Sequence, residues 1–117
     1  MISITETYGI ETDADNFSVM KCRITGENSK IPGEVKWDPV AHYPLIISGG
    51  FFLGLTHAKM YIFMKEIGAD FSDFSDVNKV IAKADEVFQA IKAADMALHD
   101  EVYRVVLEKE QAKHKKA

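Results

Sequence analysis

The stretch SGGFFLGLTHAKMYIF, residues 48–63, decides the fold, because it places glycines in the most apolar part of the chain. Gly50, Gly54 and Ala58 recur every four residues, so in a helix they would share one face. Each Gly costs a helix interior about 1 kcal/mol relative to Ala, which is tolerated where a neighbour lies too close for larger side chains. We therefore predict a glycine-containing helix over residues 48–67 that packs closely against another element.

The expected ends of this helix carry capping residues: Ser48 suits the N-cap and Gly68 the C-terminal cap. The same spacing of small residues occurs in pairs of membrane helices. A membrane span needs about 20 apolar residues. Polar residues and a proline interrupt the apolar run here, at His42, Pro44, His57 and Lys59. We therefore predict a buried helix and no membrane span.

The residues before this helix are typical of strands. Three segments are rich in β-formers and alternate apolar with polar side chains: ISITETYGIE (2–11), FSVMKCRIT (17–25) and EVKWDPVAHYPLII (34–47). Pro39 and Pro44 confine the third strand to an edge of a sheet. The pattern predicts a small antiparallel three-stranded meander over about residues 1–47, which needs a helix on one face for stability.

The C-terminal part contains neither Gly nor Pro from Ser75 onward and predicts a long amphipathic helix over about residues 75–112. Its apolar residues recur at intervals of three and four and supply the helix-packing or dimer contacts, among them Val80, Val87, Ile91 and Leu98. The segment either bends into two helices or projects and pairs with a second chain, so we expect a homodimer. The tail, residues 113–117, is expected to fray. The predicted fold is α+β, in a single domain of residues 1–117.

The composition is that of an ordinary globular domain, with 117 residues, 47% hydrophobic and 27% charged, and a net charge of −4. The acidic balance disfavours direct nucleic-acid binding and favours a basic protein or a nucleic-acid-binding enzyme as partner. Cys22 is the single cysteine, so no disulfide framework is expected. The first residues lack the charged and apolar regions of a signal peptide, which favours a cytoplasmic location.

Sequence motifs for catalysis are not found. The four histidines show no spacing that would place two metal ligands on one helix face. Cys22 alternates with Met20 and Ile24, as a buried, inert thiol would. The glycines near residue 50 are not followed by the Lys and Ser or Thr of a phosphate-binding loop. We therefore expect no enzyme, no metal and no cofactor.

Two groups of residues are candidates for recognising a partner protein. Aromatic residues flank the prolines of the third strand, where they could anchor an interface or simply cover the sheet: Trp37, His42 and Tyr43. Acids cluster at the start of the long helix, where they could form an acidic patch or simply complement the helix dipole: Asp70, Asp73 and Asp76.

The segment ETDADNFSVMKCRI, followed by GEVKWDPVAHYP, resembles a group of small bacteriophage and prophage proteins. The shared features are a hairpin with an Asp…Asn-Phe turn and a Trp that precedes an aromatic pair and a proline, matched here by Asp13, Asn16, Phe17, Trp37, His42, Tyr43 and Pro44. The resemblance covers the layout of residues 8–98. It implies a hairpin, a helix and then a longer helix, with no catalytic residues. The glycines of the first helix depart from the family, which has Glu, Gln and Ala there.

The resemblance, the small size and the acidic charge together lead to the hypothesis of a non-enzymatic phage-type accessory protein that binds another protein. Its most concrete form is an anti-defence inhibitor of the anti-CRISPR type. Acids would then fill the basic channel of a host enzyme, namely Asp13, Asp15, Asp70, Asp73 and Asp76. Two alternatives stay open: a homodimeric scaffolding module, and a minor phage factor of nucleic-acid metabolism that uses the basic tail.

Overall fold

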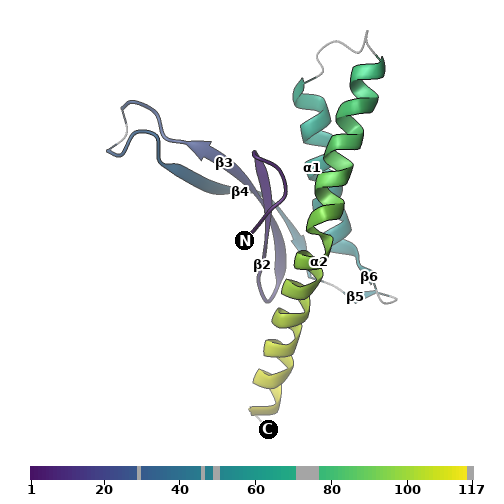
Figure 1. Ribbon diagram of the computed structural model, residues 1–117. Helices are drawn as coiled ribbons and strands as arrows, with labels where there is room; N and C mark the ends of the chain where they lie inside the picture. Colours follow the sequence, from purple (N-terminus) through teal and green to yellow (C-terminus); the bar gives the residue numbers. More distant parts are fainter. Residues whose placement is uncertain (29, 46, 49–50, 71–76, 116–117) are drawn as a thin grey trace.

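The computed structural model describes the chain except for residues 29, 46, 49–50, 71–76 and 116–117. Four antiparallel strands form one sheet in the order β1-β2-β3-β4, and a second, two-stranded sheet pairs β5 with β6. Two helices pack against one face of the larger sheet (Figure 1). The predicted α+β class is therefore confirmed.

The bounds of the strands are Ile2–Ser3 (β1), Tyr8–Thr12 (β2), Asn16–Ile24 (β3), Val35–Pro44 (β4), Ile47–Ser48 (β5) and Phe51–Phe52 (β6). The helices span Leu53–Asp70 (α1) and Val77–Lys115 (α2). The molecule is flat, with principal extents of 59 × 42 × 19 Å. Its two layers are the sheet and the helices.

The large sheet has four strands rather than the three predicted, because the first predicted strand is folded back on itself. Thr5 causes the reversal: its Oγ1 accepts hydrogen bonds from the amides of Thr7 at 3.3 Å and Tyr8 at 3.0 Å. A Thr hydroxyl that bonds nearby amides offers the backbone an alternative to a continuous strand. The Tyr8 carbonyl in turn accepts from the amides of Ile4 and Thr5, each at 3.0 Å.

The hairpin of β3 and β4 is longer than the rest of the sheet. β2 pairs with β3 only between Phe17 and Lys21, while β4 accompanies β3 as far as Ile24. The Cys22 amide donates to the Thr7 carbonyl at 2.7 Å. Beyond it, no third strand in the described part of the chain pairs with β3 or β4. We call residues 23–36 the ribbon, and Figure 1 shows it projecting clear of the helices.

The first helix begins and ends later than predicted. Ser48 is not its N-cap but a residue of β5, where it pairs with Phe51, and α1 starts only at Leu53. Gly68 does not end the helix, which continues to Asp70. Gly50, assigned to the contact face of this helix, lies outside the described residues. In the described part of the chain, neither helix has the length and apolar character needed to cross a membrane.

The core lies between the sheet and the buried faces of both helices. Phe17 and Val19 of β3 are fully buried, as are Ala58 and Ile62 of α1. Gly54 is buried as well, one turn before Ala58. The small-residue face therefore does meet a close neighbour, and that neighbour is the sheet.

The second helix is one continuous helix of 39 residues, which settles the choice between one helix and two. Val87, Ile91 and Leu98 are buried in the core, and Val80 is partly buried. The N-terminal half of α2 runs alongside α1, and the C-terminal half continues past it (Figure 1). An ion pair joins the two helices, with Lys59 Nζ 2.7 Å from Asp95 Oδ1.

Candidate functional site

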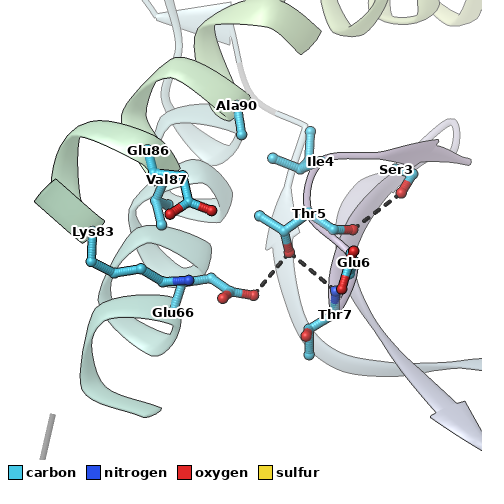
Figure 2. Close-up of a pocket in the computed structure, with 10 residues that line it drawn as sticks. All are labelled: Ser3, Ile4, Thr5, Glu6, Thr7, Glu66, Lys83, Glu86, Val87 and Ala90. Atoms are coloured by element: carbon cyan, nitrogen blue, oxygen red, sulfur yellow. Dashed lines mark hydrogen bonds between the residues drawn. The ribbon is translucent and has the colours of Figure 1, made fainter. Parts of the chain in front are cut away.

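An open cleft of about 630 Å³ lies between the β1–β2 turn and the two helices. Figure 2 shows its lining, which comprises Ser3, Ile4, Thr5, Glu6, Thr7, Glu66, Lys83, Glu86, Val87 and Ala90. Its central contact is the hydrogen bond that the Thr5 hydroxyl donates to Glu66 Oε1 at 2.8 Å. This bond ties the turn to α1, so Thr5 and Glu66 serve the fold.

A tyrosine that follows the β1–β2 turn has a changed acidity. Burial, with smaller contributions from Tyr61 and Glu66, raises the pKa of Tyr8 above its ordinary value. A raised pKa keeps the phenol protonated, which is the wrong direction for a base or nucleophile at neutral pH. In the part of the chain that the structure describes, no group of three or more His, Cys, Asp or Glu side chains could hold a metal ion.

A serine and a histidine meet on the sheet. The Ser18 hydroxyl lies 2.8 Å from His42 Nδ1, a distance at which a histidine can activate a serine nucleophile. The two residues are direct partners in the β3–β4 register, so strand pairing alone brings them together. His42 is thereby placed beside Ser18 on the sheet and away from the ribbon.

The other predicted aromatic residues separate from His42. Tyr43 is partly buried against the core and meets the ring of His57 edge-on, with centroids 5.8 Å apart. Trp37 is half-buried and pairs with Cys22 at the base of the ribbon. Of the three aromatic candidates, Trp37 alone lies next to the ribbon.

The acids of the β2–β3 turn have structural partners. Asp13 Oδ1 accepts hydrogen bonds from the amides of Asp15 at 2.8 Å and Asn16 at 2.7 Å, as an Asx turn requires. Asp15 Oδ1 lies 4.0 Å from Lys109 Nζ, and this ammonium also donates to the Ala14 carbonyl at 3.3 Å. The turn is therefore held against the C-terminal half of α2, and a lysine of the basic tail is engaged there.

The remaining acids do not join this turn. Asp70 is the last residue of α1, at the end of the helix pair opposite to Lys109 (Figure 1). Asp73 and Asp76 lie outside the described residues. Asp70 therefore belongs to a different part of the fold from the β2–β3 turn that holds Asp13 and Asp15.

The end of the ribbon carries an apolar cluster that sequence reasoning missed. Ile24 and Val35 are direct cross-strand partners, so their side chains lie on one face, and 68% and 57% of their surfaces are exposed. Ile31, in the connection between the strands, is 61% exposed. We call these three residues the ribbon tip. Trp37 lies on the same face as Ile24 and Val35, two residues along β4.

The ribbon tip is ordered by a buried threonine. The Thr25 hydroxyl donates to the Ile31 carbonyl at 2.5 Å and accepts from the Glu34 amide at 2.9 Å. The Thr25 amide donates to the Glu34 carbonyl at 2.9 Å, and the Gly33 amide donates to the Thr25 carbonyl at 3.0 Å. Gly33 has φ of 79°, a left-handed conformation that favours glycine.

The segment GENSKIPG, residues 26–33, lies between the predicted strands 17–25 and 34–47, and the sequence prediction gave it no part in binding. The signal in the sequence was the isoleucine before Pro32, an apolar residue in an otherwise polar connection.

No known protein family, curated protein or solved structure matches the chain.

Proposed function

We propose that the chain is a non-enzymatic accessory protein that binds another protein through the ribbon tip. The observation that carries the proposal is the exposure of Ile24, Ile31 and Val35 at the end of a ribbon that stands clear of the helices. Single exposed apolar residues are common on protein surfaces. Three together on a projecting element are typical of a binding site, because burying them against a partner removes their apolar surface from water.

The hydrogen bonds of Thr25 are a second reason to expect that the ribbon tip binds a partner. A partner that binds a mobile loop must first order it, and that ordering costs affinity. Here the connection is already held by bonds from both the backbone and the side chain of Thr25, which is 6% exposed. The ribbon tip is therefore pre-organised, which favours binding of a partner with a matching apolar groove.

Trp37 extends this surface toward the sheet. Its ring lies on the face that carries Ile24 and Val35, and its neighbour across the ladder is Cys22. Buried tryptophans often dominate the affinity of protein interfaces. In this proposal the partner covers Trp37 together with the ribbon tip.

The resemblance to phage accessory proteins directs the search for the partner to host or phage enzymes that act on nucleic acid, including defence nucleases. The net charge of −4 suits a basic enzyme. The form of inhibitor that we favour uses the ribbon rather than a joint acidic surface, because Asp15 lies beside Lys109 in the C-terminal half of α2, whereas Asp70 is the last residue of α1.

Affinity purification from the cells that produce the protein tests the proposal. The double variant Ile24→Lys, Val35→Lys places two charges on the ribbon tip without touching the core, since both positions are exposed. The matched control is Leu107→Lys on α2, a position that is 60% exposed. We expect the wild type and the control to retain the same protein partner and the double variant to lose it.

Retention of the partner by a correctly folded double variant would contradict the proposal. So would equal loss from the double variant and from Leu107→Lys, because binding would then not depend on the ribbon. Circular dichroism of each variant verifies that the fold is kept.

A further inference from the structure

The long helix carries a second stripe of side chains that its own fold does not use. Its first stripe, which includes Val87, Ile91 and Leu98, is buried in the core. The second recurs at intervals of four and three and consists of exposed residues throughout: Ile81, Asp85, Phe88, Lys92, Met96, His99 and Tyr103. Such spacing is typical of a seam between two helices. We call these seven residues the outer stripe.

The apolar members of the outer stripe are unusually exposed for residues of their size. The exposed fractions are 61% for Ile81, 55% for Phe88, 78% for Met96 and 60% for Tyr103. These four residues span more than six turns of α2, so they form a line along the helix and not an isolated contact.

The first helix widens this surface. An apolar groove of about 510 Å³ lies between α1 and α2, with Met60 and Phe63 on one wall and Phe88 and Ile91 on the other. Met60 and Met64, one turn apart on α1, are 54% and 67% exposed. Phe88 therefore belongs both to the outer stripe and to the groove, and it marks the centre of the apolar surface.

The whole molecule exposes more surface than its size requires. A compact monomer of 13.1 kDa has an accessible surface of about 6400 Å², whereas this chain has 8088 Å². Its radius of gyration is 16.9 Å, against about 13 Å for a compact domain of this length.

The apolar area on the helices matches what a dimer needs. With about 200 Å² for each large side chain, the exposed parts of Met60, Met64 and the four apolar members of the outer stripe amount to roughly 750 Å². A standard interface takes about 800 Å² from each partner. The surface is thus large enough for a stable pair.

We propose that a second copy of this chain covers the outer stripe, with its α2 antiparallel to the first and the two-fold axis beside Phe88 and Gln89. In this arrangement each residue faces the residue equally distant on the other side of the axis. Ile81 then faces the partner's Met96, and Asp85 faces the partner's Lys92. The two copies of Phe88 lie side by side at the centre, and the two pairs of helices form a four-helix bundle.

The charges select the antiparallel arrangement. In a parallel pair each residue would face its own counterpart, so Asp85 would meet Asp85 and Lys92 would meet Lys92. Like charges across an interface oppose association, and opposite charges set the orientation. The antiparallel pair contains two Asp85–Lys92 contacts, one on each side of the axis. A second copy therefore matches an apolar pair, Ile81 with Met96, and a charged pair, Asp85 with Lys92, on each side of the axis.

The test is the native mass of the full chain and of two charge-reversal variants, Asp85→Lys and Lys92→Asp, measured by sedimentation equilibrium. The wild type should have twice the mass of 13.1 kDa. Each variant alone brings four like charges together near the axis, so its dissociation constant should rise by about tenfold or more. An equimolar mixture of the two should dimerise again, because every facing pair then has opposite charges.

A wild type that stays at 13.1 kDa at every concentration would overturn the proposal. So would single variants that dimerise as tightly as the wild type, or a mixture that dimerises no better than either variant. Phe88→Glu should abolish the dimer, while Ile24→Glu on the ribbon should leave it unchanged. Ile24→Glu separates this proposal from the proposed function, because it changes the ribbon tip and leaves the outer stripe intact.

Discussion

Gly54 lies directly against Pro44, so that a Cβ atom on Gly54 would collide with the Pro44 carbonyl oxygen. The same Cβ would lie 3.1 Å from Cδ2 of Phe17. The helix can therefore approach the end of β4 only because residue 54 has no side chain. This contact fixes the distance between α1 and the sheet.

Replacing Gly54 with Ala should destabilise the fold. A backbone carbonyl cannot rotate away as a side chain can, so α1 would have to shift and the core around Phe17 would loosen. We expect a loss of about 2 kcal/mol in the free energy of unfolding, although Ala is the better helix former. Urea denaturation followed by circular dichroism measures it.

Gly68 provides the matched control within the same helix, since a Cβ there would meet nothing within 4 Å. Gly68→Ala should stabilise the protein by up to about 1 kcal/mol, through helix propensity alone. If the two substitutions changed stability equally, the close contact at Gly54 would have no energetic role.

Thr5 should contribute to stability through its hydroxyl. Thr5→Val keeps the shape but removes the acceptor for the Tyr8 and Thr7 amides and the donor to Glu66. We expect the free energy of unfolding to fall by about 2 kcal/mol, because a buried amide is left without a partner. Thr5→Ser keeps the hydroxyl and should lose less than about 1 kcal/mol. A Val variant as stable as the Ser variant would argue against the turn described here.

The raised pKa of Tyr8 predicts a loss of stability at alkaline pH. Burial and the nearby Tyr61 and Glu66 favour the neutral phenol in the fold, whereas the unfolded chain ionises near pH 10. The contribution of Tyr8 to the free energy of unfolding is therefore fully present below pH 10. It declines as the pH rises from 10 toward the pKa of Tyr8 in the folded protein.

Denaturation measured at pH 9 to 11 tests whether the free energy of unfolding falls with rising pH, as predicted. Tyr8→Phe should remove part of the decline above pH 10, whereas Tyr103→Phe, at a residue that is 60% exposed, should leave it unchanged. Absorbance at 295 nm, recorded for the wild type and for Tyr8→Phe, should show that Tyr8 ionises above pH 10. A decline identical in all three proteins would contradict the assignment to Tyr8.

Periodicity was sufficient to predict the long helix and the α+β class. The spacing of Val87, Ile91 and Leu98 identifies the buried face of α2, and these residues are buried. The close approach at Gly54 was also predictable, since a glycine in an apolar helix indicates a near neighbour. That the neighbour is the end of β4 depends on tertiary packing, which sequence spacing does not contain.

The missed features depend on contacts between residues far apart or on turns within apparent strands. Thr5 divides the first strand by bonding nearby amides, a local competition that alternation of residue types does not show. Ser48 has the chemistry of an N-cap but pairs with Phe51 instead. The ribbon tip became visible only once the register showed how early β2 ends, leaving Ile24 and Val35 without a further neighbour.

Photo-crosslinking from the ribbon tip tests the central claim most directly. A photoreactive amino acid replaces Ile31, or Leu107 as control, in the full chain within the producing cells, and the products are identified by mass spectrometry after irradiation. Position 31 should yield one dominant adduct with a second protein, and position 107 should not. No adduct from position 31, or the same adducts from both positions, would contradict a partner-binding ribbon.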